Sequence, residues 1–147
     1  MADMSRFKWL PADTLTISNG TPTGDIGDTQ IWHDGNELQV AEVAGVPGIY
    51  ATFDFENVET IRYVHTTCYY IGSATHWVSI EIYNYTTTAW DPLASIEAGN
   101  AMHSYLLPVL DYTDYINASN QSIVRYYHPT TGNNAHDLYI CCLFLLY

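Results

Sequence analysis

Six histidines are the side chains of this chain best suited to bind a transition metal, because neutral imidazole is a common metal ligand. They are His33, His65, His76, His103, His128 and His136. None forms an HxH or HxxxH motif, so no metal site is predicted within a single segment. His76 can approach His128 or His136 across strands. We nevertheless expect strand or loop histidines with ordinary hydrogen bonds, and therefore no metal site and no cofactor.

Other side chains with catalytic or ion-binding chemistry lack the spacing that such sites need. Asp25, Asp28 and Asp34 lie in a glycine-rich segment, but without the spacing of a calcium loop or its distant bidentate glutamate, so we expect solvated carboxylates. The sequence has no GxSxG motif and no phosphate-binding GxGxxG, GKS or GKT motif. We expect no catalytic residues and no enzyme activity. A hydrolase with serine, histidine and aspartate assembled from distant segments is the alternative.

The three cysteines, Cys68, Cys141 and Cys142, indicate buried thiols. An odd number without CxxC spacing argues against a disulfide framework and against a zinc site. Residues 1–10 lack the apolar region of a signal peptide, and the apolar run 140–147 is too short to span a bilayer. We therefore expect a chain made in a reducing cytoplasm, without a membrane partner.

The charge balance excludes one large class of partner. Four basic side chains stand against sixteen acidic ones, which gives a formal net charge of −12. Such a field repels phosphates, so we expect no binding to nucleic acid and none to an anionic membrane surface.

Two tryptophans are the best candidates for stacking on a sugar ring. Trp77 and Trp90 have neighbours that can bond sugar hydroxyls, and we name Arg125 and His128 with them as candidate glycan-binding residues. Packing of both tryptophans in the core or between subunits is the favoured alternative. Arg125 is expected on a central strand, paired with a carboxylate such as Glu81 or Asp111, or forked onto a ligand.

Alternation of apolar and polar residues predicts the elements that position these side chains. Period-two patterns occur in residues 50–55, 78–83 and 122–128, with a return strand at 90–96, a shorter strand around 104–109 and a further strand at 112–116. The continuous apolar run 138–147 is typical of a strand in the middle of a sheet, covered on both faces. About eight strands at roughly ten-residue spacing predict an all-β jelly-roll β-sandwich.

The first part of the chain differs from the rest. Residues 1–48 are rich in Thr, Gly, Asp and Asn and are expected to form an extended N-terminal arm and loops, separate from a sandwich at 49–147. Apolar side chains in this arm are expected to dock onto a partner or a neighbouring copy: Phe7, Trp9, Leu10, Ile31 and Trp32.

Several runs in residues 49–147 combine into one pattern of strands and loops. They are Phe53-Asp54-Phe55, Tyr70-Ile71-Gly72-Ser73, 76–85, Trp90-Asp91-Pro92-Leu93, 124–128, Gly132-Asn133 and 136–140. This pattern resembles the galactose-binding-like jelly rolls, which occur as carbohydrate-binding modules and in bacteriophage virion proteins. The resemblance implies a jelly roll with sugar or calcium sites in its loops, although no ligand set of the family matches this chain residue by residue.

These observations lead to two expected functions. The first is a virion accessory protein of a tailed bacteriophage, most simply a capsid decoration protein that docks through its arm on capsid or tail proteins, as a homo-oligomer within the assembly. Such an interface would bury more than roughly 1,000 Å², and deleting residues 1–35 would leave a folded domain that no longer binds the particle. The alternative is a carbohydrate-binding or receptor-binding module of a phage tail or fibre.

Overall fold

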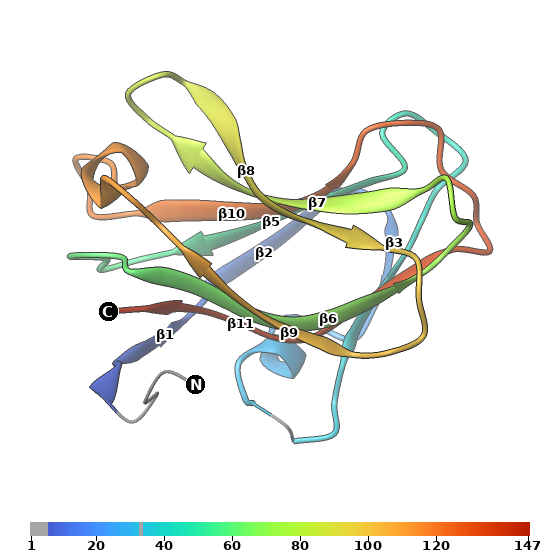
Figure 1. Ribbon diagram of the computed structural model, residues 1–147, viewed down its shortest axis with the longest axis horizontal. Coiled ribbons are helices and arrows are strands. Elements are labelled where there is room, and N and C mark those ends of the chain that lie inside the picture. Colours follow the sequence, from blue (N-terminus) through green and yellow to red (C-terminus); the bar gives the residue numbers. More distant parts are fainter. Residues whose placement is uncertain (1–5, 33) are drawn as a thin grey trace.

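The computed structural model describes residues 6–32 and 34–147, so His33 and the first five residues of the expected arm lie outside the described part. The described residues form eleven strands and two short 3-10 helices (Figure 1). The elements are β1 (Trp9–Pro11), β2 (Thr14–Asn19), β3 (Thr21–Thr23), η2 (Ile26–Thr29), β4 (Leu38–Ala41), β5 (Ile49–Phe55), β6 (Tyr63–Ile71), β7 (Trp77–Asn84), β8 (Ala89–Glu97), β9 (His103–Pro108), η3 (Tyr112–Tyr115), β10 (Ser122–His128) and β11 (Asp137–Leu146).

The strands form two antiparallel sheets that pack face to face (Figure 1). The six-stranded sheet has the order β3-β4-β11-β6-β9, and β1 also pairs with β11. The five-stranded sheet has the order β2-β5-β10-β7-β8. The predicted all-β sandwich is therefore confirmed, with eleven strands in place of about eight.

Alternation along the strands builds the core between the sheets. In β5 and β10 every second side chain is buried, and Phe53 lies opposite Val124 in the register of the pair. The fully buried Tyr126 satisfies its hydroxyl by donating to Thr66 Oγ1 at 2.7 Å, because Thr66 itself donates to the Cys142 carbonyl. A buried phenol of this kind contributes apolar area without leaving a polar atom unpaired.

Residues 9–23 and 38–41 supply four strands of the sandwich, which corrects the expected arm. β1 pairs with β11, β2 with β5, β3 with β4, and β4 with β11, so the expected boundary at residue 48 does not separate an arm from a domain. Thr and Gly in this segment mark short edge strands and tight turns. Gly20, for example, has a φ of +124° between β2 and β3, a conformation that glycine adopts without steric cost.

The β7–β8 hairpin confirms the predicted return strand. The Asn84 side-chain oxygen accepts hydrogen bonds from the backbone N–H groups of Thr86 and Thr87, at 3.0 Å each, and so closes the turn. Thr88 completes the turn in the left-handed region, with a φ of 54°. The expected strand at 112–116 is wrong, since this segment contains the 3-10 helix η3.

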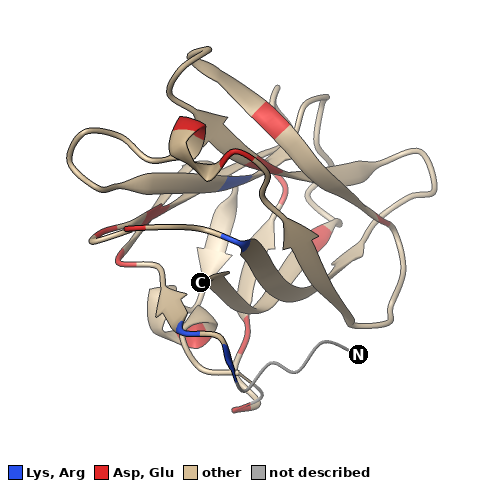
Figure 2. Ribbon diagram, turned by 60° about the vertical axis from the view of Figure 1, so that its left-hand side comes forward, with Lys and Arg blue, Asp and Glu red and all other residues tan. Residues whose placement is uncertain are grey.

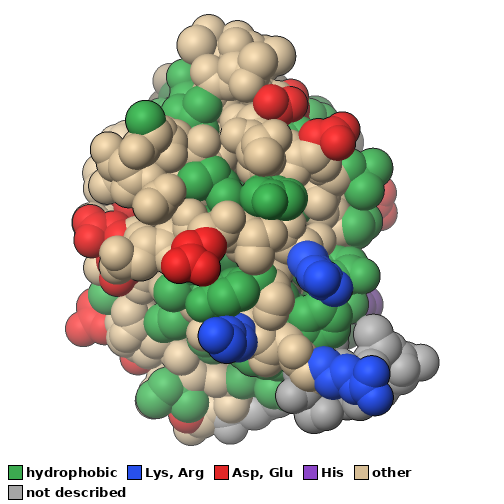
Figure 3. Space-filling view, turned by 90° about the vertical axis from the view of Figure 1, so that its left-hand side faces the viewer, with side chains coloured by type: hydrophobic (Ala, Val, Ile, Leu, Met, Phe, Trp, Pro, Cys, Tyr) green, Lys and Arg blue, Asp and Glu red, His purple; other side chains and the backbone are tan. Residues whose placement is uncertain are grey.

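Acidic positions are spread over strands and loops of both sheets (Figure 2). On one end of the sandwich, basic side chains lie among hydrophobic and neutral polar ones, with acidic side chains at several separate places (Figure 3). Among the described residues, no helix is long and apolar enough to cross a membrane.

Burial should protect the thiols from modification. Cys68, Cys141 and Cys142 are free and buried, and burial raises the pKa of Cys68 to about 12 and that of Cys142 to about 11. Because the thiolate is the reactive form, we expect iodoacetamide at pH 8 to leave these cysteines unmodified in the folded protein and to label them after unfolding. Mass spectrometry measures the labelling, and rapid labelling of the folded chain would contradict the prediction.

Removing residues 1–35 should destroy the folded state. The deletion removes β1, β2 and β3, leaves β5 as an unprotected edge, and uncovers part of β11. We expect the truncated chain to lose cooperative thermal unfolding and to aggregate, measured by circular dichroism and size-exclusion chromatography beside the full chain. A cooperative transition within a few degrees of that of the full chain would overturn this reading.

Candidate functional site

The outer face of the five-stranded sheet carries a group of aromatic side chains. Because alternate residues of each strand point inward to the core, the intervening residues must point outward. We call the resulting surface the aromatic face, and its aromatic members are Tyr50, Trp77, Tyr83, Trp90 and Tyr127.

Arg125 lies at the centre of the aromatic face. Its guanidinium forms an ion pair and a hydrogen bond with Glu81, which sits opposite it on β7. The guanidinium carbon is 4.0 Å from the ring centroid of Tyr127, 4.3 Å from that of Trp90 and 5.1 Å from that of Tyr50. Cation–π contacts and a carboxylate partner therefore hold Arg125 and the rings around it in one arrangement.

Trp90 forms one end of the aromatic face together with Tyr83. The two residues are register partners on β8 and β7, and their rings meet edge to face with centroids 5.1 Å apart. One side of the Trp90 indole lies on Arg125, and the side chain keeps part of its surface in solvent. Trp90 is thus a ring fixed from below and accessible from above.

Trp77 lies at the other end of the aromatic face, where the surface is hollowed. Its side chain is 39% exposed, and together with Ala74, His76, Ser95 and Glu97 it lines a cleft of about 270 Å³.

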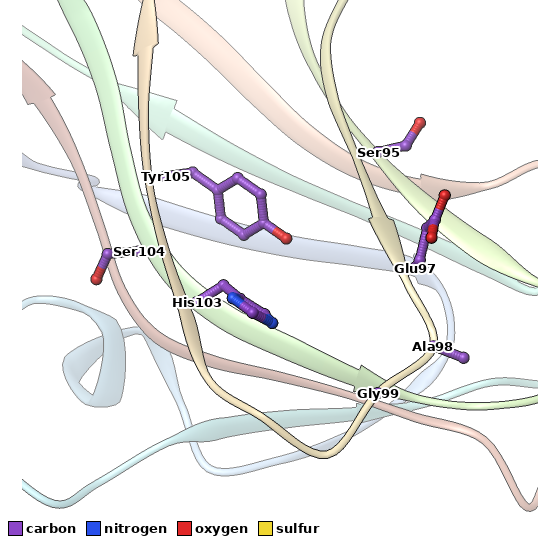
Figure 4. A pocket seen from close by; sticks show the side chains of 7 residues that line it. All are labelled: Ser95, Glu97, Ala98, Gly99, His103, Ser104 and Tyr105. Carbon is purple, nitrogen blue, oxygen red and sulfur yellow. The ribbon is translucent and has the colours of Figure 1, made fainter.

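A larger cleft of about 430 Å³ continues from Ser95 and Glu97 to the facing edge of the other sheet. Figure 4 shows Tyr105 and His103 on β9 reaching toward Glu97 on β8 across this cleft.

Ser104 and His103, neighbours on β9, are not paired in the way a hydrolase needs. Ser104 points away from His103 (Figure 4), and its hydroxyl is hydrogen-bonded to Thr67 at 2.8 Å. Ser104 is therefore not oriented as a nucleophile beside a base.

The structure separates the four candidate glycan-binding residues. Trp77, Trp90 and Arg125 share the aromatic face, and Arg125 has the predicted partner Glu81. His128 is fully buried, because it ends β10 with its side chain turned between the sheets, so a glycan on the surface cannot touch it.

The residues expected to dock onto a partner pack mostly on the chain itself. Phe7 meets Tyr63 edge to face at 5.5 Å, and Trp9 stacks on Trp32 at 5.4 Å. Leu10 packs against the main core, whereas Ile31 and Trp32 stay 57% and 44% exposed. A docking role for this group of residues stays a prediction. Ile31 and Trp32 are the two members that are accessible to a partner.

Tyr50 and Tyr127 are members of the aromatic face that the sequence analysis missed as site residues. They are register partners on β5 and β10, and their rings meet 5.5 Å apart. The signal was present, since both stand at outward positions of alternating strands, with Tyr127 two residues from Arg125. What alternation does not reveal is that β5 and β10 are neighbours.

Comparisons with solved structures support the fold. A carbohydrate-binding module of family 29 superposes with a TM-score of 0.55 at 12% identity, covering 96% of this chain and 89% of that one. A variant of such a module complexed with mannohexaose gives a TM-score of 0.53 at 12% identity, covering 95% and 90%. These neighbours have a galactose-binding-like jelly roll, as the sequence resemblance implied. No protein-family profile and no curated protein matches the chain.

Replacing Arg125 should destabilise the fold through the charge it leaves behind. In Arg125→Met, the largely buried Glu81 loses its cationic partner. We therefore expect the free energy of unfolding to fall by about 2–3 kcal/mol. The double variant Arg125→Met, Glu81→Gln should lose less stability than the two single variants together, because it leaves no unpaired buried charge. Denaturant unfolding measures all three, and strictly additive losses would show that the pair is not coupled.

Proposed function

We propose that this chain is a non-catalytic carbohydrate-binding module that binds a glycan chain along its aromatic face. The observation that carries the proposal is the placement of Trp77 and Trp90 at opposite ends of one sheet face, with Tyr50, Tyr127 and Arg125 between them. Six residues of strand separate Trp77 from Tyr83, the partner of Trp90, which corresponds to about 20 Å at the usual rise per residue. Such a face is long enough for several consecutive sugar rings.

The chemistry of the face suits a sugar chain. The apolar side of a pyranose ring can lie on an aromatic ring, while polar groups around it bond the hydroxyls. Glu81, Thr52 and Asp54 supply such groups on the same face, and Ser95 and Glu97 supply them in the cleft beside Trp77. The Arg125 guanidinium holds the Trp90 ring in place before a ligand binds. This lowers the entropy cost of ordering that side chain on binding.

The charge of the molecule narrows the glycan class to neutral chains. The net charge is −12, and carboxylates lie on the face and in the cleft. A uronate or sulfated chain would be repelled by this field. The structural neighbour complexed with mannohexaose makes that neutral hexasaccharide the first probe.

Capsid decoration is less well supported by the geometry. The sequence argument for it depended on a free arm with aromatic side chains to bury in a partner. Phe7 and Trp9 instead pack on the outer side of the six-stranded sheet. A location in a virion stays a prediction, and none of the contacts described above bears on it.

Trp77→Ala and Trp90→Ala should each weaken binding of mannohexaose at least about tenfold, equivalent to about 1.4 kcal/mol. Each variant removes a stacking ring at one end of the face without opening the core. Isothermal titration calorimetry measures affinity, and thermal unfolding verifies that the fold is intact.

Trp32→Ala is the matched control, because Trp32 is similarly exposed but stacks on Trp9 of the other sheet. It should leave the affinity unchanged. If Trp32→Ala weakens binding while Trp77→Ala and Trp90→Ala do not, the glycan site is not on the aromatic face. Absence of binding to neutral hexasaccharides of several linkages by the unmodified chain would refute the proposed function.

A further inference from the structure

A buried carboxylate lies among histidines at the end of the sandwich opposite the β7–β8 hairpin. Glu42 follows β4 and is 2% exposed. Figure 1 shows the loops after β4, β6 and β10 meeting at this end, and they bring His76, His128 and His136 to Glu42. In the part of the chain that the structure describes, ring nitrogens of these three imidazoles lie 3.3–3.8 Å from the Glu42 carboxylate oxygens. A buried carboxylate in such a place needs a cation or a full set of hydrogen bonds.

The hydrogen bonds of Glu42 aim its second oxygen toward two ring nitrogens. The Tyr70 hydroxyl donates to Oε1, and the Asn133 backbone N–H donates to Oε2 at 2.6 Å. Burial, reinforced by the bond to Glu42, raises the pKa of Tyr70 far above its usual range, so the phenol stays a donor. Glu42 Oε2 then lies 3.3 Å from His136 Nδ1 and 3.6 Å from His76 Nδ1. The same His136 Nδ1 is 3.1 Å from the Tyr70 hydroxyl oxygen, a contact that a bound metal would replace.

His76 provides a second, independent observation. Its Nδ1 has no exposed surface and no hydrogen-bond partner, although it points to Glu42. A buried ring nitrogen without a hydrogen-bond partner is uncommon in folded proteins, and a bound cation is one arrangement that would satisfy it. His128 differs, because its Nδ1 donates to the Trp77 carbonyl at 2.7 Å and its Nε2 lies 3.1 Å from Thr130 Oγ1.

From this geometry we infer a site for a divalent transition metal of the Zn²⁺ class, with Glu42, His76 and His136 as ligands. Their ligand atoms all lie within 4.8 Å of one another. In a tetrahedral site with bonds of about 2.0–2.1 Å, neighbouring ligand atoms are roughly 3.3–3.4 Å apart, close to the 3.3 and 3.6 Å found here.

The donor set selects the class of metal. Two imidazoles and one carboxylate suit zinc and similar ions, whereas calcium takes six to eight oxygen ligands. The ring nitrogens and the carboxylate come from three loops that are far apart in the sequence, so a bound ion would cross-link them.

An entry path and a rigid frame accompany the ligands. The side chains of His76 and His136 are 22% and 11% exposed, and His76 lines the cleft beside Trp77. The frame depends on a close backbone approach, since a Cβ added at Gly132 would stand 2.3 Å from the Val43 carbonyl oxygen. The Glu42 backbone N–H also donates to the His136 carbonyl at 2.9 Å, which ties two of the ligand segments together. Three protein ligands leave a fourth position for water or another group.

Titration of the tag-free full chain with ZnCl₂ tests this site. We expect one equivalent of Zn²⁺ to bind by calorimetry, and Co²⁺ to give the intense visible absorption of a tetrahedral complex. At a free Zn²⁺ concentration about 100 times Kd, the melting temperature should rise by roughly 5–10 °C.

His76→Ala and His136→Ala should each raise the Kd for Zn²⁺ at least tenfold and abolish the Co²⁺ band. His103→Ala, at an exposed histidine on β9, is the matched control and should change neither. If His136→Ala does not fold, His76→Ala decides alone, since its side chain is partly exposed. Failure of the unmodified chain to bind Zn²⁺, or equal affinity in His76→Ala, would show that the cluster is a hydrogen-bonded polar core without a metal. Because no glycan is present, this outcome is separate from the test of the aromatic face.

Discussion

β11 is buried on both of its faces, and the arrangement of the rest of the chain follows from that constraint. On the inner side, Leu143 and Leu145 join the main core. On the outer side, Cys142, Phe144 and Leu146 form a second apolar cluster. An apolar strand in the centre of a sheet needs cover on both sides. The second sheet covers one side, and Phe7, Trp9 and their neighbours must cover the other.

This requirement makes the two outer faces of the sandwich different. The outer face of the six-stranded sheet is used to bury the chain's own N-terminal segment. Among residues 6–32 and 34–147, no strand or helix covers the outer face of the five-stranded sheet, which carries an ion pair and hydroxyl-bearing rings around Arg125. An aromatic surface that is ordered but uncovered is the property a ligand-binding face requires. The candidate site therefore lies on the five-stranded sheet, whereas β1 and β11 pair in the six-stranded sheet.

The positions of individual strands could be predicted from the alternation of apolar and polar residues. Which strands are neighbours in a sheet could not. Alternation at 78–83 and 122–128 placed β7 and β10, and the lone Arg125 led to Glu81 as a partner. The arm at residues 1–48 was wrong because short edge strands rich in Thr and Gly carry almost no periodic signal. The apolar run of β11 indicated cover on both faces, but the sequence did not show that Phe7 and Trp9 of the same chain supply the outer cover. The expected approach of His76 to His128 or His136 is found, with ring centroids 4.7 and 4.8 Å apart. The presence of Glu42 beside them was beyond reach, because its segment meets theirs only through the pairing of distant strands.

The buried cluster and the aromatic face meet at two adjacent residues. His76 points to Glu42, whereas Trp77 begins β7 and points to the aromatic face. The Trp77 carbonyl can only accept, so the proton in its bond with His128 is on Nδ1 of that histidine. His128 in turn stacks on His76, with ring centroids 4.7 Å apart. The position of Trp77 is thus fixed from inside by polar groups that an apolar core would not supply. A polar cluster at this end of the sandwich costs desolvation, and its effect is to hold one end of the aromatic face in place.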